Sequence, residues 1–267
     1  MEWKRVKTIL IAVLLLTCLL LAVNIVRQVR ERRLHERDAV RDACAVALRA
    51  GVKIDSRLVL ALPERDAVLV ASRSEKTEQR LADALLGEGC VPEEPGGGVS
   101  IYENETGRIS VRRGGAVEIH LKGTDTAMDE HDWIGLLQKA GLDLSNAETQ
   151  MKDEETVFLQ RTEEGTEIVN CRLICSISSG ELLISGRWLL EQTPPQGETG
   201  RVRAELTLAL TKLMEQAGAT EVHALTRGYN LQSDSVRQLR LVPVWVAETN
   251  AGTIILNTVT KKIVPVS

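Results

Sequence analysis

Aromatic side chains are scarce in this sequence of 267 residues, where Phe, Trp and Tyr together make up 3% of the chain. They form no cluster, although proteins that bind single-stranded nucleic acid need several aromatic rings on which the bases stack. A concentrated basic face is missing as well, because acidic residues outnumber basic ones and the formal net charge is −4. Both absences argue against nucleic acid as a partner.

Metal-binding and catalytic motifs are also absent. The five cysteines and four histidines include no CxxC pair and no cluster with the spacing of a zinc site. No HExxH, GxSxG or phosphate-binding loop occurs anywhere in the chain. We therefore predict that the protein is not an enzyme and that it holds no metal and no cofactor.

The remaining cysteines and polar motifs have structural explanations. Cys171 and Cys175 would share one face of a strand about 13 Å apart, too far for a disulfide, so we expect buried free thiols. A bridge between Cys44 and Cys90 stays open as an alternative. The acidic run at 129–132 is predicted to cap a helix rather than bind a cation, and Asn104 in the sequence Asn-Glu-Thr to serve a turn rather than glycosylation.

Charge is missing altogether from residues 8–26, which read TILIAVLLLTCLLLAVNIV. A helix of this length spans roughly 28 Å, close to the hydrocarbon thickness of a bilayer. It has no polar face for water, so we predict a membrane helix rather than a buried core helix. A cleaved signal peptide is the more serious alternative, but the stretch is long for one and no small-x-small cleavage site follows it. A lipoprotein signal at Cys18 would need a small residue before the cysteine, where Thr17 stands.

The charges that flank this span conflict on orientation. Three basic residues precede it, and six arginines follow it: Arg27, Arg30, Arg32, Arg33, Arg37 and Arg41. A simple count places the large domain in the cytoplasm. However, long domains translocate across the membrane largely regardless of their charge. The N-terminal tail comprises only residues 1–7. These two facts favour a large domain on the side of the membrane opposite to the cytoplasm.

Two polar side chains, Thr17 and Asn24, interrupt the apolar span. In lipid, hydroxyl and amide groups bond to neighbouring helices. A separation of seven residues places the two side chains on one face of the helix, two turns apart. We predict a partner-binding face made of Thr17 and Asn24. The alternative is that Thr17 bonds to its own backbone and that Asn24 lies at the membrane interface.

Residues 27–50 are predicted to continue as a helix, first as a polar stalk and then, from Val40 onward, with an apolar stripe of helical period. Gly51 is a natural helix stop. The arginines of the stalk form either a solvated face or a contact with anionic membrane lipid.

The rest of the chain shows three helices, each followed by short strands. The helices are expected at 75–87, 131–141 and 201–217, and the strands at 99–122, 155–188 and 221–266. A helix packed on an antiparallel sheet is an α+β arrangement. We therefore predict an α+β fold with one N-terminal transmembrane helix and an extracytoplasmic domain of two or three helix-on-antiparallel-sheet units. After the stalk and first helix (27–50), these units cover 51–125, 126–192 and 193–267, the last ending in a β-hairpin.

Short motifs at the two ends of the chain resemble the YycI family. At the start, MEWKRVKTILI leads into the uncharged span, and a charged helix later runs into Leu48–Ile54 and then Leu62-Pro63. At the end, VPVWVAET at 242–249 and Gly252 precede Ile255–Asn257 and Lys262-Ile263, which is similar to the terminal hairpin of that family. The matches cover roughly 1–65 and 240–265. The tyrosine that the family usually carries in its final strand is absent.

The resemblance implies a single-pass cell-membrane protein with a cytoplasmic N-terminus and an extracellular domain. It implies a non-catalytic regulator that modulates a sensor histidine kinase of the WalK (YycG) type, together with a YycH-like protein, in cell-wall homeostasis. Contact would be made chiefly through the transmembrane helix. The alternative hypothesis is a membrane-tethered extracytoplasmic binding module for peptide or cell-wall fragments.

Overall fold

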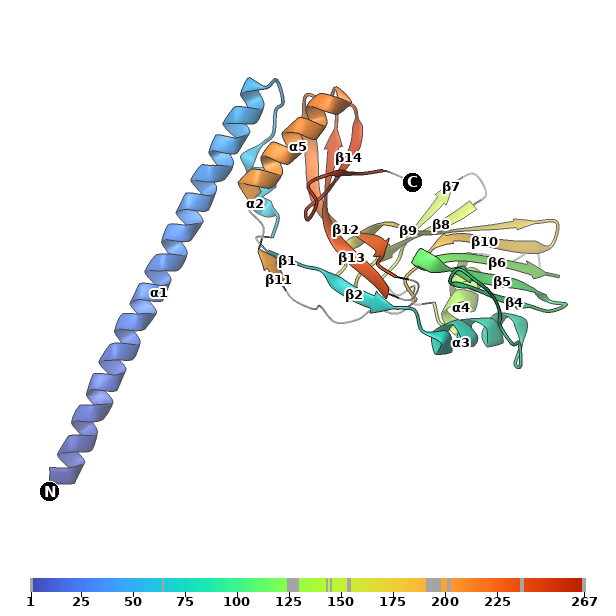
Figure 1. The fold of residues 1–267 in the computed structure, drawn as a ribbon, viewed down its shortest axis with the longest axis horizontal. Helices are drawn as coiled ribbons and strands as arrows, with labels where there is room; N and C mark the ends of the chain where they lie inside the picture. The colour runs from blue at the N-terminus through green and yellow to red at the C-terminus, as the bar shows by residue number, and fades with distance from the viewer. Residues whose placement is uncertain are drawn as a thin grey trace.

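The computed structural model of the chain describes residues 2–63, 65–123, 130–142, 144, 146–152, 155–190, 198–200, 203–235 and 238–265. Figure 1 shows a very long N-terminal helix that leads into a domain of strands and shorter helices. The helices are α1 (Glu2–Arg49), α2 (Ser56–Ala61), α3 (Glu75–Leu86), the 3-10 turn η1 (Arg113–Gly115), α4 (Glu130–Lys139) and α5 (Arg203–Ala217).

The described chain contains fifteen strands. They are β1 (Arg65–Ala67), β2 (Leu69–Ser72), β3 (Glu93–Gly96), β4 (Val99–Glu103), β5 (Gly107–Arg112), β6 (Ala116–Lys122), β7 (Glu148–Lys152), β8 (Glu155–Arg161), β9 (Glu167–Ser178), β10 (Glu181–Arg187), β11 (Glu198–Gly200), β12 (Val222–Ser233), β13 (Gln238–Thr249), β14 (Gly252–Asn257) and β15 (Ile263–Val264). Three of them, β9, β12 and β13, have 12 residues each.

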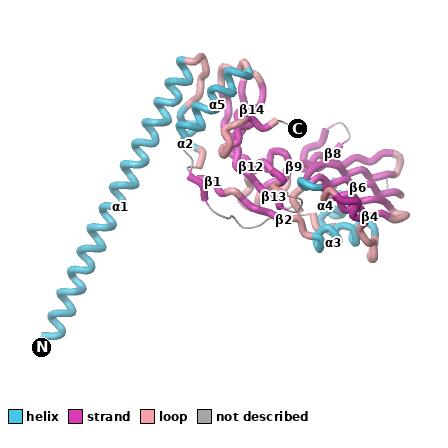
Figure 2. Tube along the Cα trace, viewed as in Figure 1, coloured by secondary structure: helices cyan, strands magenta, loops and turns pink. Residues whose placement is uncertain are grey.

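Thirteen of these strands join in one mainly antiparallel sheet, and β1 and β11 form a separate two-stranded ribbon. The order is β15-β14-β13-β12-β9-β10-β6-β5-β4-β3, with β2 added on β13 and β7-β8 added on β9. Figure 2 shows this sheet in magenta with the short helices lying against it. The α+β class is confirmed: an apolar N-terminal helix precedes a large, antiparallel-dominated sheet domain.

The helices expected near 75, 131 and 201 are α3, α4 and α5, and the expected meander at 99–122 is β4, β5 and β6. Several short elements were not predicted from the sequence, namely α2, β1, β2, β3, β7 and β11. Strand β3 lies between the helix expected at 75–87 and the strands expected from 99, and β11 lies between the strands expected up to 188 and the helix expected from 201. Each missed element has six residues or fewer, too few to show a hydrophobic period.

Buried side chains form three clusters along the sheet. One lies where α3 and α4 cover strands β4–β6 and β8–β10, and a second lies where α1, α2 and α5 cover β12–β14. A small third cluster, which includes Tyr229 and Leu231, lies between them. Four of the seven aromatic residues, Trp188, Trp245, Tyr102 and Phe158, are among the largest fully buried side chains of this core. Trp245, on the strand face opposite to Val244, is therefore packed against a second layer.

The predicted division of the domain at 125 and 192 stays a prediction. Strands β6 and β10 come from the first and second of those segments and pair directly, from Lys122 with Glu181 to Ala116 with Arg187. Strand β2 of the first segment pairs with β13 of the third. Hydrogen bonding of the sheet therefore runs across both boundaries.

Several local predictions are confirmed. Helix α1 ends at Arg49, and Gly51 takes a left-handed φ of 84° that suits a glycine. The side-chain oxygen of Asn104 accepts hydrogen bonds from the backbone N–H groups of Thr106 and Gly107 at 2.9 and 3.2 Å, so it builds the turn between β4 and β5. All five cysteines are free, and Cys44 and Cys90 belong to different core clusters.

Burial makes the two central thiols chemically inert. Cys171 and Cys175 are both buried in the sheet. Loss of contact with water raises the pKa of the Cys171 thiol, and it raises the pKa of Cys175 to about 12. The reactive form of cysteine is the thiolate, so neither residue is a nucleophile at neutral pH.

Candidate functional site

The N-terminal half of α1 stands clear of the domain (Figure 1). Its large apolar side chains are more than half exposed, from Leu10 at 61% to Val26 at 68%. Among the described residues it is the one helix long and apolar enough to cross a membrane, with a mean hydropathy of 1.8 and none of the apolar window buried. An apolar surface of this length favours a lipid environment over water. The helix thus fits single-pass membrane anchoring of a soluble domain.

The two predicted contact residues differ in their hydrogen bonding. The Thr17 hydroxyl donates to the carbonyl oxygens of Val13 and Leu14 at 2.8 and 3.0 Å, so it is bonded within its own helix. The Asn24 side chain lies exposed on α1, and no residue that the structure describes bonds to it. A partner face at Thr17 and Asn24 stays a prediction, and Asn24 is the residue whose polar groups are available for it.

The C-terminal half of the same helix belongs to the domain core. Val40 and Ala47 are fully buried in the cluster that also holds Leu210 and Met214 of α5 and Trp245 of β13. Small side chains at the contact let the backbones of two helices approach closely. The apolar stripe expected from Val40 onward is therefore the docking face of α1 on α5.

A largely buried arginine at the start of α5 stabilises the contact between α1 and α5. The guanidinium of Arg203, at the start of α5, donates to the Glu36 carboxylate at 2.8 Å and to the backbone carbonyl of Leu62. Both side chains of the ion pair are largely buried, at 11% and 20% exposed. Arg203 thereby joins α1, α5 and the segment that follows α2. This contact could not be predicted from the sequence, because Arg203 and Glu36 lie 167 residues apart and neither residue occurs in a motif.

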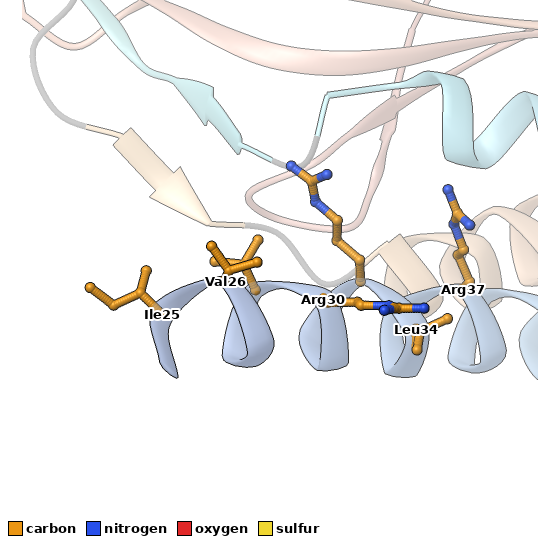
Figure 3. A pocket seen from close by; sticks show the side chains of 7 residues that line it. Ile25, Val26, Arg30, Leu34 and Arg37 are labelled. Atoms are coloured by element: carbon orange, nitrogen blue, oxygen red, sulfur yellow. The ribbon is translucent and has the colours of Figure 1, made fainter. Parts of the chain in front are cut away.

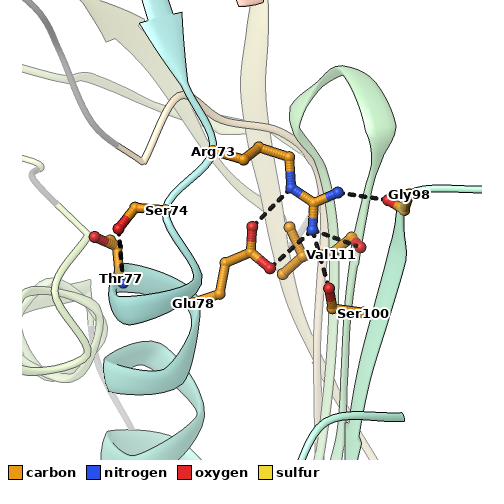
Figure 4. Close-up of polar contacts among 7 residues, drawn as sticks. All are labelled: Arg73, Ser74, Thr77, Glu78, Gly98, Ser100 and Val111. Carbon is orange, nitrogen blue, oxygen red and sulfur yellow. Dashed lines mark hydrogen bonds and ion pairs between the residues drawn. The ribbon is translucent and has the colours of Figure 1, made fainter. Parts of the chain in front are cut away.

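A second buried ion pair stabilises the distant end of the sheet (Figure 4). The Arg73 guanidinium donates to both carboxylate oxygens of Glu78 at 2.7 and 2.8 Å, and also to the Gly98 carbonyl and the Ser100 hydroxyl. Burial, with the nearby Glu78 carboxylate, raises the pKa of Tyr102 to about 12. Partners surround both charges, so we assign this pair a structural role, joining β2 and α3 to β4.

An open face of the sheet provides a shallow groove of about 470 Å³ over β5, β6 and β10. Two charged side chains of its lining, Arg112 and Glu118, pair with each other at 2.7 Å. Arg108 contacts Glu103 at 3.6 Å and His120 contacts Glu181 at 2.9 Å, and both of these carboxylates lie outside the lining. Both arginines of the groove therefore already have carboxylate partners.

Metal ligands do not converge in the described part of the chain, where no group of three or more His, Cys, Asp or Glu side chains could hold an ion. The acidic run at 129–132, predicted to cap a helix, lies outside the residues whose side chains the structure describes.

Comparison with known proteins gives distant likenesses of fold alone. No family model matches this chain, and no curated protein does. A crystal structure of an uncharacterized protein from Eubacterium rectale is similar with a TM-score of 0.45 and 12% identity, covering 77% of this chain and 86% of that one. The C-terminal domain of Bacillus megaterium YpeB has a TM-score of 0.35 and 13% identity, covering 74% and 98% of the two chains.

The docking of α1 predicts unequal effects for two acidic residues of the same helix. Replacing Glu36 with Ala leaves the partly buried Arg203 without its carboxylate, so we expect a loss of about 1.5–3 kcal/mol in the free energy of unfolding. Replacing Glu31 with Ala removes an exposed pair with Arg27 and should cost about 0.5 kcal/mol or less. Denaturant unfolding of the full chain in detergent measures both, and equal losses would contradict the assigned role of Arg203.

Proposed function

We propose that this protein is a non-catalytic, single-pass membrane regulator that modulates a sensor histidine kinase of cell-wall homeostasis, chiefly through its transmembrane helix. The observation that carries the proposal is the continuity of α1, whose exposed apolar half and buried docking half form one helix from Glu2 to Arg49. Enzymes and simple anchors need no such rigid connection, because a flexible linker holds a domain at a membrane equally well.

A continuous helix makes the span and the domain move together. Helix α1 is about 70 Å long at ~1.5 Å per residue, and its last turns are fixed by Val40, Ala47 and the Arg203–Glu36 pair. Rotation or tilt of the span in the bilayer therefore acts on α5 and on the sheet beneath it. A regulator of a membrane kinase would use this connection to bias the arrangement of the transmembrane helices of the kinase.

The kinase and its WalK type come from the resemblance at 1–65 and 240–265, as do the YycH-like partner and the extracellular position of the domain. A C-terminal fusion tests the orientation. Alkaline phosphatase placed after Ser267 should be active in cells if the domain lies outside, and the same position fused to a reporter that functions only in the cytosol should be silent. The reverse pair of results would contradict this orientation.

Polar contact within the bilayer should involve Asn24 more than Thr17, because the Thr17 hydroxyl is already bonded to its own helix. Replacing both residues with Leu should preserve insertion and folding but reduce co-purification with the kinase. At ~0.5–2 kcal/mol for each interhelical bond, the expected loss is on the order of 2- to 30-fold. Most of the loss should be reproduced by Asn24→Leu alone. Quantitative mass spectrometry of complexes extracted from membranes measures it.

The matched control is Ala22→Leu, which adds a leucine about 140° around the helix from Thr17 and should leave the association unchanged. Full co-purification of the Thr17→Leu/Asn24→Leu protein would place the contact in the soluble domain. The second candidate function, an extracytoplasmic binding module for peptide or wall fragments, would then be favoured. The groove over β5, β6 and β10 is the surface that such a module would use.

A further inference from the structure

Directly beyond the apolar span, the flank of α1 carries a groove of about 500 Å³. Arg30, Arg33 and Arg37 line it together with apolar side chains that include Val26 and Val29. Figure 3 shows Val26 and Arg37 rising from the helix on the side that faces the domain, whereas Ile25 extends sideways from the end of the helix segment drawn. The groove therefore combines an apolar floor at its membrane end with three guanidinium groups along its length.

Helix geometry gathers the three arginines on one face of α1, beginning at the height of the lipid headgroups. At about 100° per residue they fall within an arc of about 60°. Their backbones lie roughly 6, 10 and 16 Å beyond Val26, whereas the headgroup layer extends about 5–8 Å from the hydrocarbon core. Arg30 lies within that layer. The longer reach of a flexible arginine side chain brings Arg33, and in part Arg37, toward it.

These three arginines have no acidic partner among the described residues, a property that they share with Arg32 on another face of the helix but not with Arg27 or Arg41. Arg27 pairs with Glu31 at 2.9 Å and Arg41 with Asp38 at 3.8 Å. By contrast, no described residue forms an ion pair or hydrogen bond with the side chains of Arg30, Arg33 or Arg37. Three like charges within one arc repel each other, and an anion placed among them removes that repulsion. Guanidinium groups bind phosphate through paired N–H donors.

We propose that this groove binds the headgroup phosphate of an anionic phospholipid of the bilayer in which α1 is inserted. The phosphate would lie between Arg30 and Arg33, with Arg37 above it. Val26 and Val29 would contact the glycerol and the first methylene groups of the acyl chains. The lipid would fix the height and rotation of α1, and through the docked half of the helix it would fix the domain relative to the membrane. The proposal does not depend on a kinase partner.

Native mass spectrometry of the full chain tests this site. The protein is extracted in a neutral detergent containing equal amounts of dioleoylphosphatidylglycerol and dioleoylphosphatidylcholine, and the lipids retained after removal of the micelle are counted. We expect the native chain to retain more phosphatidylglycerol than phosphatidylcholine. In Arg30→Gln/Arg37→Gln the preference should fall on the order of 10- to 30-fold, because each basic residue near an anionic surface contributes about a factor of five.

The control variant is Arg27→Gln/Arg32→Gln, which removes the same charge from the same helix but outside the arc, and it should keep the preference. Four outcomes would overturn the proposal. The first is no preference for phosphatidylglycerol in the native chain, and the second is a preference that Arg30→Gln/Arg37→Gln retains. The third is an equal loss of preference in both variants, which would indicate diffuse charge. Displacement of the retained lipid by millimolar inorganic phosphate would instead indicate a site for free anions. All four replaced side chains are exposed, so both variants should unfold at the temperature of the native chain.

Discussion

The continuity of α1 is the constraint on which the arrangement of the whole molecule depends. Residues 27–39 are too polar to be held by a core, and a helix of this length is marginal in water when isolated. The segments of α1 on either side of residues 27–39 are nonetheless both stabilised as helix. In lipid, a backbone must satisfy its hydrogen bonds internally, which makes the span a helix. On the other side, Val40 and Ala47 are packed in the core. The polar stretch needs only to propagate a helix that is already nucleated at each end.

The docked end of α1 connects the exposed apolar half of the helix to the sheet through few layers. Arg203 bonds Glu36, and α5 packs on β12–β14 in the cluster that contains Trp245. Strand β12 then contacts β9 through a parallel pair at Tyr229 and Ile168, and β9 pairs with β10, which pairs with β6. Protein interiors are close-packed and have low compressibility, so they transmit strain from one element to the next. The pair of Arg73 and Glu78 stabilises the far end of this path, where α3 meets the sheet.

The sequence was most informative where one local pattern dominates, either an uncharged stretch or a regular spacing of apolar residues. Residues 8–26 predict the span because charge is absent, and α3 and α5 show helical spacing with clear stop signals. The alternation of residues 242–256 predicts the strand pair β13–β14, although the burial of Trp245 by α1 and α5 needs tertiary contacts that no local pattern contains. For the same reason, Arg203 with Glu36 and Arg73 with Glu78 could not be predicted. At the candidate site, the sequence alone could not distinguish Thr17, whose hydroxyl is bonded within its own helix, from Asn24, whose side chain is not.

Amide hydrogen exchange along α1, measured for the full chain in lipid nanodiscs, tests the central claim most directly. If the span and the core helix are one rigid element, the amides of residues 27–39 should be protected by several orders of magnitude, to a degree close to those of 40–49. Protection should extend without a gap from Val26 to Arg49. Exchange of residues 27–39 at the rate of an unstructured peptide, between two protected segments, would show a flexible linker, and the mechanical coupling of membrane and domain would be contradicted.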